Sequence, residues 1–380
     1  MNNYKICVYA ICKNEIEWID RWLDNMSGAD YIVVLDTGST DGSFEKLKED
    51  PRVTRVEQKI IDPWRFDVAR NESMKLVPED TDIYVCTDFD ELFENKNWCD
   101  ILRQHWKPDD DRCHYTYAWS HNDLGEPQDV FKYDKIHTKE YYWKFPVHEV
   151  LYPKDLNKIE RVLDAGEYIY LHHWQDLNKP RKYYFDLLEL AVQENPDNSH
   201  VRMLLAREYL LRQDYENALI EYEKCLEYDD IKLPNMKSVR LETLGRIADL
   251  YAWSKQQPYT AIQYYLEFIK LDPTYREPYF CMADVYLAMG LYALAIGCIE
   301  SGLKYTYQHY DWVERKDNWI SKSDELLLYA YKGLKDYPNA IQHGNIAVHH
   351  DPNNIRLLQT YINCLEEQYN AFAEKDANQS

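Results

Sequence analysis

The chain has 380 residues, of which 66 are Asp or Glu and 44 are Lys or Arg, so its net charge is −22. Nucleic acid and anionic membrane surfaces repel a chain this acidic, which excludes both as partners. No apolar run approaches the ~18 residues that a membrane span needs, and the N-terminal residues form no signal-type apolar block. The nine cysteines are scattered and include no Cys-x-x-Cys pair, which predicts reduced thiols and a cytoplasmic location.

The start of the chain alternates apolar runs with helical periodicity. Residues 6–11 form an apolar run that predicts a buried strand, and residues 16–23 carry apolar side chains at the three- and four-residue spacing of a helix. A second apolar run at 31–35 precedes the loop Asp36-Thr37-Gly38-Ser39-Thr40-Asp41-Gly42-Ser43. This alternation predicts an α/β layer with a parallel sheet, in which ligands bind beyond the carboxyl ends of the strands.

A further apolar run, 83–87, leads directly into Asp88-Phe89-Asp90-Glu91. Carboxylates at the end of a buried strand suit a hard divalent cation such as Mg²⁺ or Mn²⁺, which usually takes more oxygens from a substrate phosphate. A solvated acidic turn is the alternative in a chain with so many carboxylates. Because the loops at 13–15, 36–43 and 88–91 each follow a predicted strand, we expect them to converge on one rim of the sheet.

These motifs resemble, in their order, those of family 2 glycosyltransferases of the GT-A fold. Lys13-Asn14-Glu15, the loop from Asp36 and the cluster from Asp88 carry the resemblance, and Trp64-Arg65-Phe66-Asp67-Val68-Ala69-Arg70-Asn71 fits the branch that carries tetratricopeptide repeats. The resemblance implies a Rossmann-like, mixed and mostly parallel sheet. It also implies a nucleotide-sugar donor, most commonly a UDP-sugar, with Mn²⁺ or Mg²⁺ as cofactor and inversion at the anomeric carbon.

The resemblance further implies roles for individual residues. Asp90 is the first choice of metal ligand, while Asp88 would bind the ribose, or the metal through a water, and Glu91 would orient one of these ligands. Asp36 matches the residue that reads the base or ribose, and Asp41 takes a similar role. The other residues expected at the nucleotide sugar are Ala10, Lys13, Asn14, Glu15, Gly38, Arg70 and Phe89.

Alternatives stay open at two of these places. The Arg70 guanidinium offers a fork of donors to a phosphate or a sugar, but it could equally pair with Asp67 at the start of a helix. Gly38 and Gly42 let the backbone approach a ligand closely, or they form a plain surface turn.

Two later segments complete the predicted site. By resemblance, His148-Glu149 lies close to the acceptor, and Glu149 is the candidate for the base that an inverting transfer needs, with a solvent-exposed strand-edge glutamate as the alternative. The run 168–171 ends in His172-His173, and a late histidine completes the metal ligands in many GT-A enzymes; we favour His172 over His173 because strand alternation and the family pattern agree there. The Gln-x-x-Arg-Trp signature of processive synthases does not follow, which predicts transfer of a single sugar.

After residue 178 the strand-like runs stop and dense helical periodicity begins, so we expect two domains, 1–178 and 179–380. Ala218, Ala261, Ala295 and Ala340 share a local frame, and the 34-residue spacing between Ala261 and Ala295 is the tetratricopeptide period. The neighbouring spacings are 43 and 45 residues, so two connections are longer than standard. We predict three to four repeats that stack into an all-α superhelix, with a capping helix at 355–373.

Three functions fit this organisation. The first is a metal-dependent, inverting glycosyltransferase that acts on a peptide or protein side chain, a Ser or Thr hydroxyl or a Cys thiol, held by the repeats. The second keeps the enzyme but gives it a glycan or lipid-linked-sugar acceptor, and the repeats then serve to form a homodimer. The third is a non-catalytic repeat adaptor whose N-terminal domain is inactive.

Overall fold

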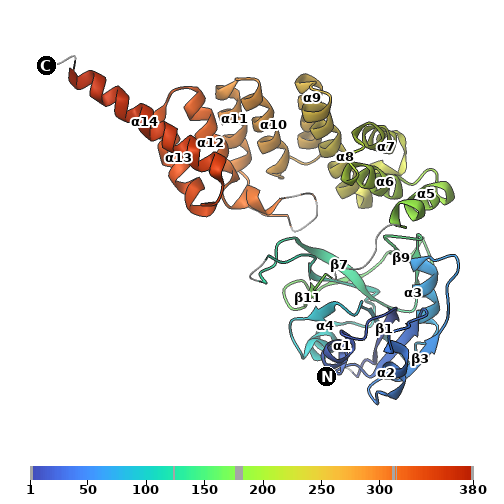
Figure 1. The fold of residues 1–380 in the computed structure, drawn as a ribbon. Coiled ribbons are helices and arrows are strands. Elements are labelled where there is room, and N and C mark those ends of the chain that lie inside the picture. Colours follow the sequence, from blue (N-terminus) through green and yellow to red (C-terminus); the bar gives the residue numbers. More distant parts are fainter. Residues whose placement is uncertain (1–2, 123–124, 176–182, 310–312, 314, 378–380) are drawn as a thin grey trace. The chain divides into compact units, whose positions relative to one another are not determined.

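The computed structural model describes residues 3–122, 125–175, 183–309, 313 and 315–377 (Figure 1). Contacts divide the chain into two units, Met1–Asn195 and Pro196–Ser380. The predicted boundary between residues 178 and 179 lies outside the described residues. Helix α5 (Tyr184–Glu194) follows that boundary but belongs to the first unit, where Glu194 pairs with Arg65 at 2.6 Å.

The first unit is built on a nine-stranded mixed sheet in which five of the eight described strand pairings are parallel. Its order is β3-β2-β1-β4-β7-β6-β11-β5, and β10 pairs with β6 off this path. A separate hairpin joins β8 and β9. The strands are β1 (Ile6–Cys12), β2 (Tyr31–Asp36), β3 (Arg55–Gln58), β4 (Ile83–Cys86), β5 (Glu91–Phe93), β6 (Arg112–Ala118), β7 (Val130–His137), β8 (Tyr141–Lys144), β9 (Val150–Pro153), β10 (Val162–Asp164) and β11 (Tyr170–His173).

Strand β1 explains why the first apolar run is continuous rather than alternating. Ile6, Val8 and Ala10 face one apolar cluster, while Cys7 and Tyr9 face a second cluster on the other side of the sheet. A strand buried on both faces needs apolar residues at every position. The predicted strands at 6–11, 31–35 and 83–87 correspond to β1, β2 and β4, and the predicted helix corresponds to α1. The unit's early helices are α1 (Ile19–Met26), α2 (Ser43–Glu49), α3 (Phe66–Met74) and α4 (Trp98–His105).

A hydrogen-bonded chain of three buried side chains lies within this core. The His137 Nδ1 donates to the Thr138 carbonyl oxygen at 2.7 Å, because a carbonyl can only accept. Its Nε2 therefore accepts from the Tyr9 hydroxyl at 2.7 Å, and Tyr9 in turn accepts from the indole N–H of Trp143 at 2.8 Å. Burial lowers the pKa of His137 to about 3, so the native imidazole stays neutral.

The shifted His137 predicts a specific acid sensitivity. Below the ordinary histidine pKa of about 6.5, the unfolded chain binds a proton that native His137 refuses, so stability falls as the pH drops from 6.5 toward 3. Between pH 8 and pH 5 this one group should lower the free energy of unfolding by about 2 kcal/mol. Urea unfolding of wild type and His137→Gln at both pH values checks this, since the other titrating groups cancel in the comparison. Parallel pH profiles of the two proteins would contradict it.

The second unit consists of helices that pack in pairs: α6 (Ser199–Leu211) on α7 (Tyr215–Glu227), α8 (Lys237–Asp249) on α9 (Pro258–Leu271), α10 (Glu277–Ala288) on α11 (Tyr292–Leu303), and α12 (Lys322–Gly333) on α13 (Tyr337–His350). Helix α14 (Ile355–Ala377) packs on α13 and α12, at the position of the predicted capping helix (Figure 1).

Close helix packing explains why alanine recurs at the same place in each repeat. The alanines at 218, 261, 295 and 340 lie on the second helix of each pair and have no exposed surface, because neighbouring helices approach closely there. The aspartates of the two Asp-Tyr-x-Asn-Ala segments, Asp214 and Asp336, both cap the following helix by accepting from a backbone N–H. The two longer spacings arise from short 3₁₀ turns between α7 and α8 and from the segment 304–321 between α11 and α12.

Two helical glycines in this unit predict opposite effects of substitution by alanine. At Gly344 in α13, an added Cβ would lie 2.6 Å from the Tyr361 ring and 3.1 Å from Leu328, so Gly344→Ala should destabilise by about 1–3 kcal/mol. At Gly297 in α11 a Cβ would meet no described atom within 4 Å, so Gly297→Ala should stabilise by about 0.5–1 kcal/mol through helix propensity alone. The shift in the far-ultraviolet thermal unfolding midpoint measures both, and equal shifts would contradict the packing.

Candidate active site

The carboxyl ends of β1, β2 and β4 lie side by side and bring the three predicted loops to one rim. Strand β1 is parallel to both of its neighbours, with Cys12 opposite Asp36 in β2 and Tyr9 opposite Cys86 in β4. The segments that follow these strands, at residues 13–15, 37–43 and 87–91, are therefore adjacent in space, as the alternation of strands and helices predicted.

Asp36 is fully buried at the end of β2, and its two oxygens differ. The Oδ1 accepts from the backbone N–H groups of Gly38 and Ser39, each at 3.0 Å, and from the side chain of Gln58 at 2.8 Å. The Oδ2 has no hydrogen-bond partner among the described residues. Gly38 bends the chain back over this carboxylate with a φ of 105°, a conformation that favours glycine. A buried carboxylate oxygen without a donor is costly, so this position suits a ligand N–H or O–H.

The loop at 13–15 holds the shape of the loop that follows β2. Asn14, at a φ of 58°, donates its backbone N–H to Ser39 Oγ at 2.9 Å and accepts from the Thr40 N–H at 2.8 Å. Glu15 donates its N–H to Ser43 Oγ at 2.9 Å. Asp41 accepts from the backbone of Ile16 and Ser43 and from the Ser43 hydroxyl, and although burial opposes it, these hydrogen bonds lower its pKa. These contacts give Asn14, Glu15 and Asp41 a role in fixing the loop, while Lys13 is exposed.

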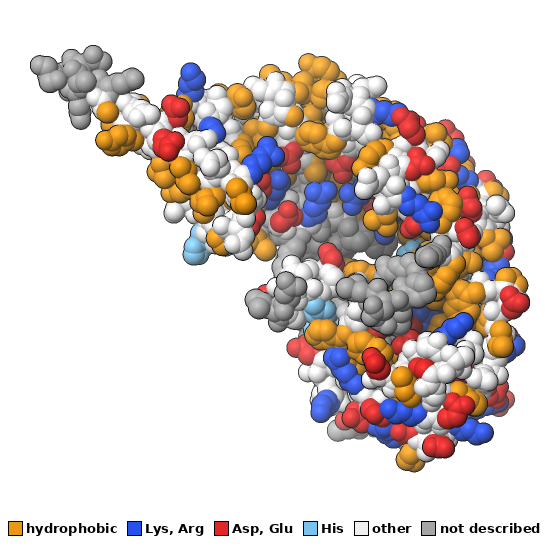
Figure 2. All heavy atoms as spheres, in the orientation of Figure 1, with side chains coloured by type: hydrophobic (Ala, Val, Ile, Leu, Met, Phe, Trp, Pro, Cys, Tyr) orange, Lys and Arg blue, Asp and Glu red, His pale blue; other side chains and the backbone are white. Residues whose placement is uncertain are grey.

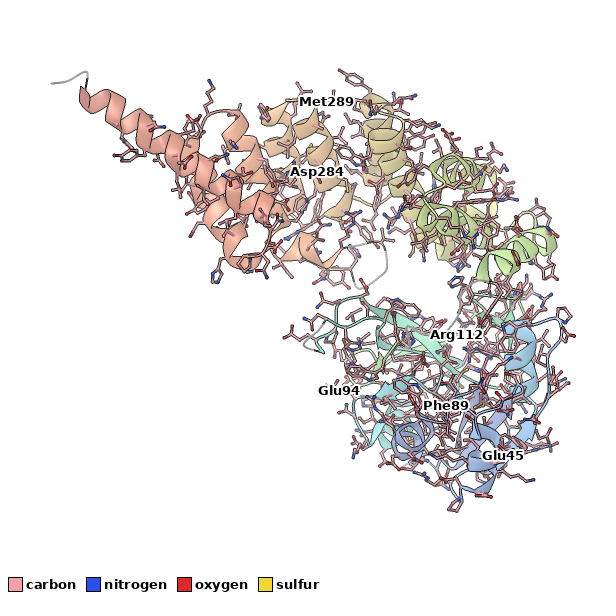
Figure 3. All side chains as sticks on the ribbon, viewed as in Figure 1. Glu45, Phe89, Glu94, Arg112, Asp284 and Met289 are labelled. Carbon is pink, nitrogen blue, oxygen red and sulfur yellow. The ribbon has the colours of Figure 1, made fainter. Side chains whose placement is uncertain are left out.

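The acidic cluster splits into exposed and buried members. Asp88 is the most exposed, with about a third of its side chain accessible, whereas Asp90 and Glu91 are buried. Phe89 is buried against Trp22, with ring centroids 4.4 Å apart, and lies inside the unit (Figure 3). Ala10 is likewise in the core. The side chains of Phe89 and Ala10 therefore pack in the protein interior and do not face a ligand at the rim.

Two buried cations surround Asp88 and Glu91. Lys135 on β7 places its Nζ 2.6 and 2.7 Å from the two Glu91 oxygens and 3.3 Å from Asp88. Glu91 also accepts from the Tyr117 hydroxyl at 2.7 Å and from the Asp88 backbone N–H at 2.9 Å, so it contacts both of these residues. Burial alone lowers the pKa of Lys135, but the facing carboxylates raise it well above its ordinary value overall, and the amine stays charged.

Arg70 is the second buried cation, and it joins two predicted site residues. Its Nη2 lies 2.9 Å from Asp88 and its Nε lies 2.5 Å from Glu149. The structure pairs the guanidinium with these carboxylates, and the Asp67 partner is instead Arg65, at 2.9 Å. Through these contacts Glu149 helps to hold the Arg70 guanidinium beside Asp88. His148 is exposed, with its ring edge-on to Tyr184.

The two histidines at the end of β11 point to different surroundings, and the one beside the acidic cluster is His173. Its Nε2 lies 3.6 Å from Asp90 Oδ2, while its Nδ1 lies 3.2 Å from the Trp119 carbonyl oxygen and donates to it. His172 instead shares a 2.8 Å hydrogen bond with His121, which stacks on Trp174. We expected His172 to face the acidic cluster, but the neighbouring residue His173 faces it. In the pairing of β11 with β5, His173 lies opposite Glu91 and His172 lies opposite Leu92.

The charges around the two histidines separate them further. Burial lowers the pKa of His173, but the hydrogen bond and charge of Asp90, together with Glu91, raise it overall. Burial and the neighbouring His121 lower the pKa of His172. Among the residues that the structure describes, no group of three or more His, Cys, Asp or Glu side chains is arranged to hold a metal ion. Asp90 and His173 are the pair that could hold a divalent cation at this rim, and such an ion would need its other ligands from a phosphate and water.

This geometry predicts different effects for the two neighbouring histidines. His173→Gln should raise the Mn²⁺ concentration needed for half-maximal ligand binding by about tenfold or more, whereas His172→Gln should leave it unchanged. A Mn²⁺ titration monitored by thermal shift in the presence of nucleoside diphosphates measures both variants. If His172→Gln raised the required Mn²⁺ concentration and His173→Gln did not, His172 would be the metal ligand.

Sequence reasoning missed Lys135, Tyr117, Trp119 and His121, which all lie on or beside β6 and β7. Lys135 had one available signal: by strand alternation it shares a face with Tyr133 and His137 in the segment Tyr133-Asp134-Lys135-Ile136-His137. A lysine on the inward side of a strand has to meet carboxylates. The other three carry no local pattern, because only the pairing of β6 with β11 brings them to the rim.

Comparison with known proteins identifies the second unit. The tetratricopeptide repeat model matches residues 199–231 and 241–275, which contain helices α6, α7 and α9 and most of α8, so the chain carries tetratricopeptide repeats as predicted. No curated protein matches the chain. No helix in the described part of the chain has both the length and the apolar character to cross a membrane.

Several solved structures are similar to part of the chain. The MamA protein is 18% identical over 45% of this chain and 82% of its own, with a TM-score of 0.36. A tetratricopeptide repeat protein from Parabacteroides merdae is 16% identical over 51% and 70%, with a TM-score of 0.38. Pseudomonas aeruginosa PilF is 15% identical over 48% and 72%, with a TM-score of 0.37.

Proposed function

We propose that the first unit is a metal-dependent glycosyltransferase domain of the GT-A type, which moves one sugar with inversion from a nucleotide-sugar donor to an acceptor in the cytoplasm. The observation that carries the proposal is the rim where Asp36 ends β2 and Asp88 and Asp90 follow β4, with His173 of β11 beside Asp90. One buried oxygen of Asp36 has no donor among the described residues. The sheet order and its mixed pairing are compatible with that fold.

In this proposal each part of the rim has a separate task. Asp36 binds an N–H or O–H of the nucleoside, and Asp88, held by Arg70 and Lys135, faces the ribose. Asp90 and His173 would hold a Mn²⁺ or Mg²⁺, which would supply positive charge next to the diphosphate leaving group. The buried cations around Asp88 and Glu91 offset part of the negative field that a chain of charge −22 presents to an anionic donor.

The acceptor in this proposal is a peptide or protein side chain, because tetratricopeptide repeats form extended surfaces that bind polypeptide. A glycan or lipid-linked sugar is the alternative acceptor. To test the enzyme, the full chain is incubated with Mn²⁺ and UDP-, GDP- and dTDP-sugars, and release of nucleoside diphosphate is scored with and without EDTA. We expect EDTA-sensitive release with one base; no metal-dependent release and no thermal stabilisation with any donor would overturn the proposal.

The comparisons favour a second candidate, a non-catalytic repeat adaptor, because the matched family model covers the repeats alone. In an adaptor the first unit binds a nucleotide sugar or nothing, without turnover. Metal-dependent stabilisation by a nucleoside diphosphate without release from any donor sugar would favour this candidate over the enzyme.

A further inference from the structure

Helix α14 carries a regular stripe of exposed apolar side chains. Its six members have between 37% and 81% of their surface accessible: Ile355, Leu358, Ile362, Leu365, Tyr369 and Phe372. Their spacing alternates strictly between three and four residues, which is the a and d pattern of a coiled-coil heptad. At a rise of 1.5 Å per residue the stripe runs for about 26 Å. Figure 2 shows hydrophobic side chains gathered along this helix.

The stripe is distinct from the face that attaches α14 to the repeats. Leu357 and Cys364 are buried in an apolar cluster with Leu328, Ala340 and Ala347 of α12 and α13. One face of α14 is thus used inside the unit, and each side chain of the stripe beside it keeps at least 37% of its surface exposed. A contiguous exposed apolar stripe of this kind marks an interaction surface.

The spacing and the flanking charges indicate what covers the stripe. A seven-residue repeat of apolar positions matches another helix with the same repeat, and not a strand or an extended peptide. The flanking positions of the stripe with described side chains are Asn354, Gln359, Tyr361, Glu366, Gln368 and Ala373, so a single charge lies beside it. Two copies of a chain with a net charge of −22 can approach only through a nearly neutral surface, and this stripe is one.

We propose that α14 pairs antiparallel with α14 of a second copy of this chain. A two-fold axis between Ile362 and Leu365 places Ile362 of one copy opposite Leu365 of the other, Leu358 opposite Tyr369, and Ile355 opposite Phe372. Each aromatic ring then meets an aliphatic side chain, whereas parallel pairing would place identical rings on each other. The same patch serves both copies, as a two-fold interface requires. Because α14 is already folded on α13, association carries no cost of helix formation.

The mass of the full chain in solution tests the proposal. Sedimentation equilibrium at concentrations up to about 100 µM should give twice the chain mass of 45.6 kDa. Leu358→Glu combined with Leu365→Glu should weaken association by about 100-fold or more. Asn353→Glu combined with Asn370→Glu adds the same charge at exposed positions off the stripe and should leave the dimer intact.

A second variant guards against loss of folding in the first. Tyr369→Ser with Phe372→Ser alters the two exposed aromatic rings near the end of the helix, and it should also give monomers with an unchanged thermal midpoint. Orientation is read by oxidative cross-linking: Leu358→Cys with Tyr369→Cys should cross-link, and Tyr369→Cys alone should not. A monomeric wild type, or a dimer that survives both stripe variants, would overturn the proposal, and cross-linking of the single variant would overturn its antiparallel form.

Discussion

Asp90→Asn should remove metal-dependent release of nucleoside diphosphate, by a factor on the order of 10²–10³ or more. The substitution keeps the size of the side chain but replaces a carboxylate with a neutral amide, which is a much weaker ligand for Mn²⁺ or Mg²⁺. Asp90 is the carboxylate of the cluster that lies beside His173, with its Oδ2 3.6 Å from the Nε2 of that histidine. Turnover is measured by diphosphate release across a Mn²⁺ titration.

The matched control is Glu94→Gln, which removes an equal charge from an exposed residue just beyond the end of β5 (Figure 3). That variant should retain wild-type turnover. Thermal unfolding separates the role of Asp90 in binding from any role in folding: we expect Asp90→Asn to match the wild type without ligand and to lose the stabilisation by Mn²⁺ with a nucleoside diphosphate. Wild-type turnover in Asp90→Asn would exclude Asp90 as the metal ligand.

The part of the fold that could be predicted from the sequence is the part with local signals. Strands β1, β2 and β4 are buried on both faces, so each leaves a continuous apolar run. The repeat helices are recognised because the same small residue recurs wherever two helices approach closely, as at Ala261 and Ala295. Strand β7 could not be placed, because its insertion between β4 and β6 depends on pairings such as Val85 with Ile136 that no local pattern encodes.

In the candidate site, too, the residues with local sequence signals could be predicted and their partners from distant segments could not. Asp36, Asp88 and Asp90 follow strands with clear signals, and the structure brings them to one rim. The partners of these residues could not be read from the sequence, because they come from distant segments: Arg70 reaches Glu149 across 79 residues, and Lys135 reaches Glu91 across 44. The choice between His172 and His173 depended on the register of β11 against β5, which shifts every side chain to the other face when it changes by one residue.

Lys135→Met should destabilise the first unit by about 3–5 kcal/mol, the largest effect on stability that we expect from one substitution. Lys135 is 3% exposed and its amine contacts both oxygens of Glu91, which is itself 1% exposed. The methionine fills a similar volume but leaves the Glu91 carboxylate buried without its cation, and Tyr117 and the Asp88 N–H supply only hydrogen bonds. Urea unfolding followed by tryptophan fluorescence measures this unit, because most of the 11 tryptophans precede residue 196.

The double variant Lys135→Met with Glu91→Gln distinguishes a buried ion pair from a general packing defect. Removing the stranded charge should recover about 1–3 kcal/mol of the loss, because a neutral amide can still accept from Tyr117 and avoids an unpaired buried carboxylate. Glu91→Gln alone should cost less stability than Lys135→Met. The Lys135 amine loses Glu91 but keeps a second carboxylate, Asp88, at 3.3 Å. If the double variant were as unstable as the sum of the single variants, the two charges would not be coupled, and Asp88 would owe its position to Arg70 alone.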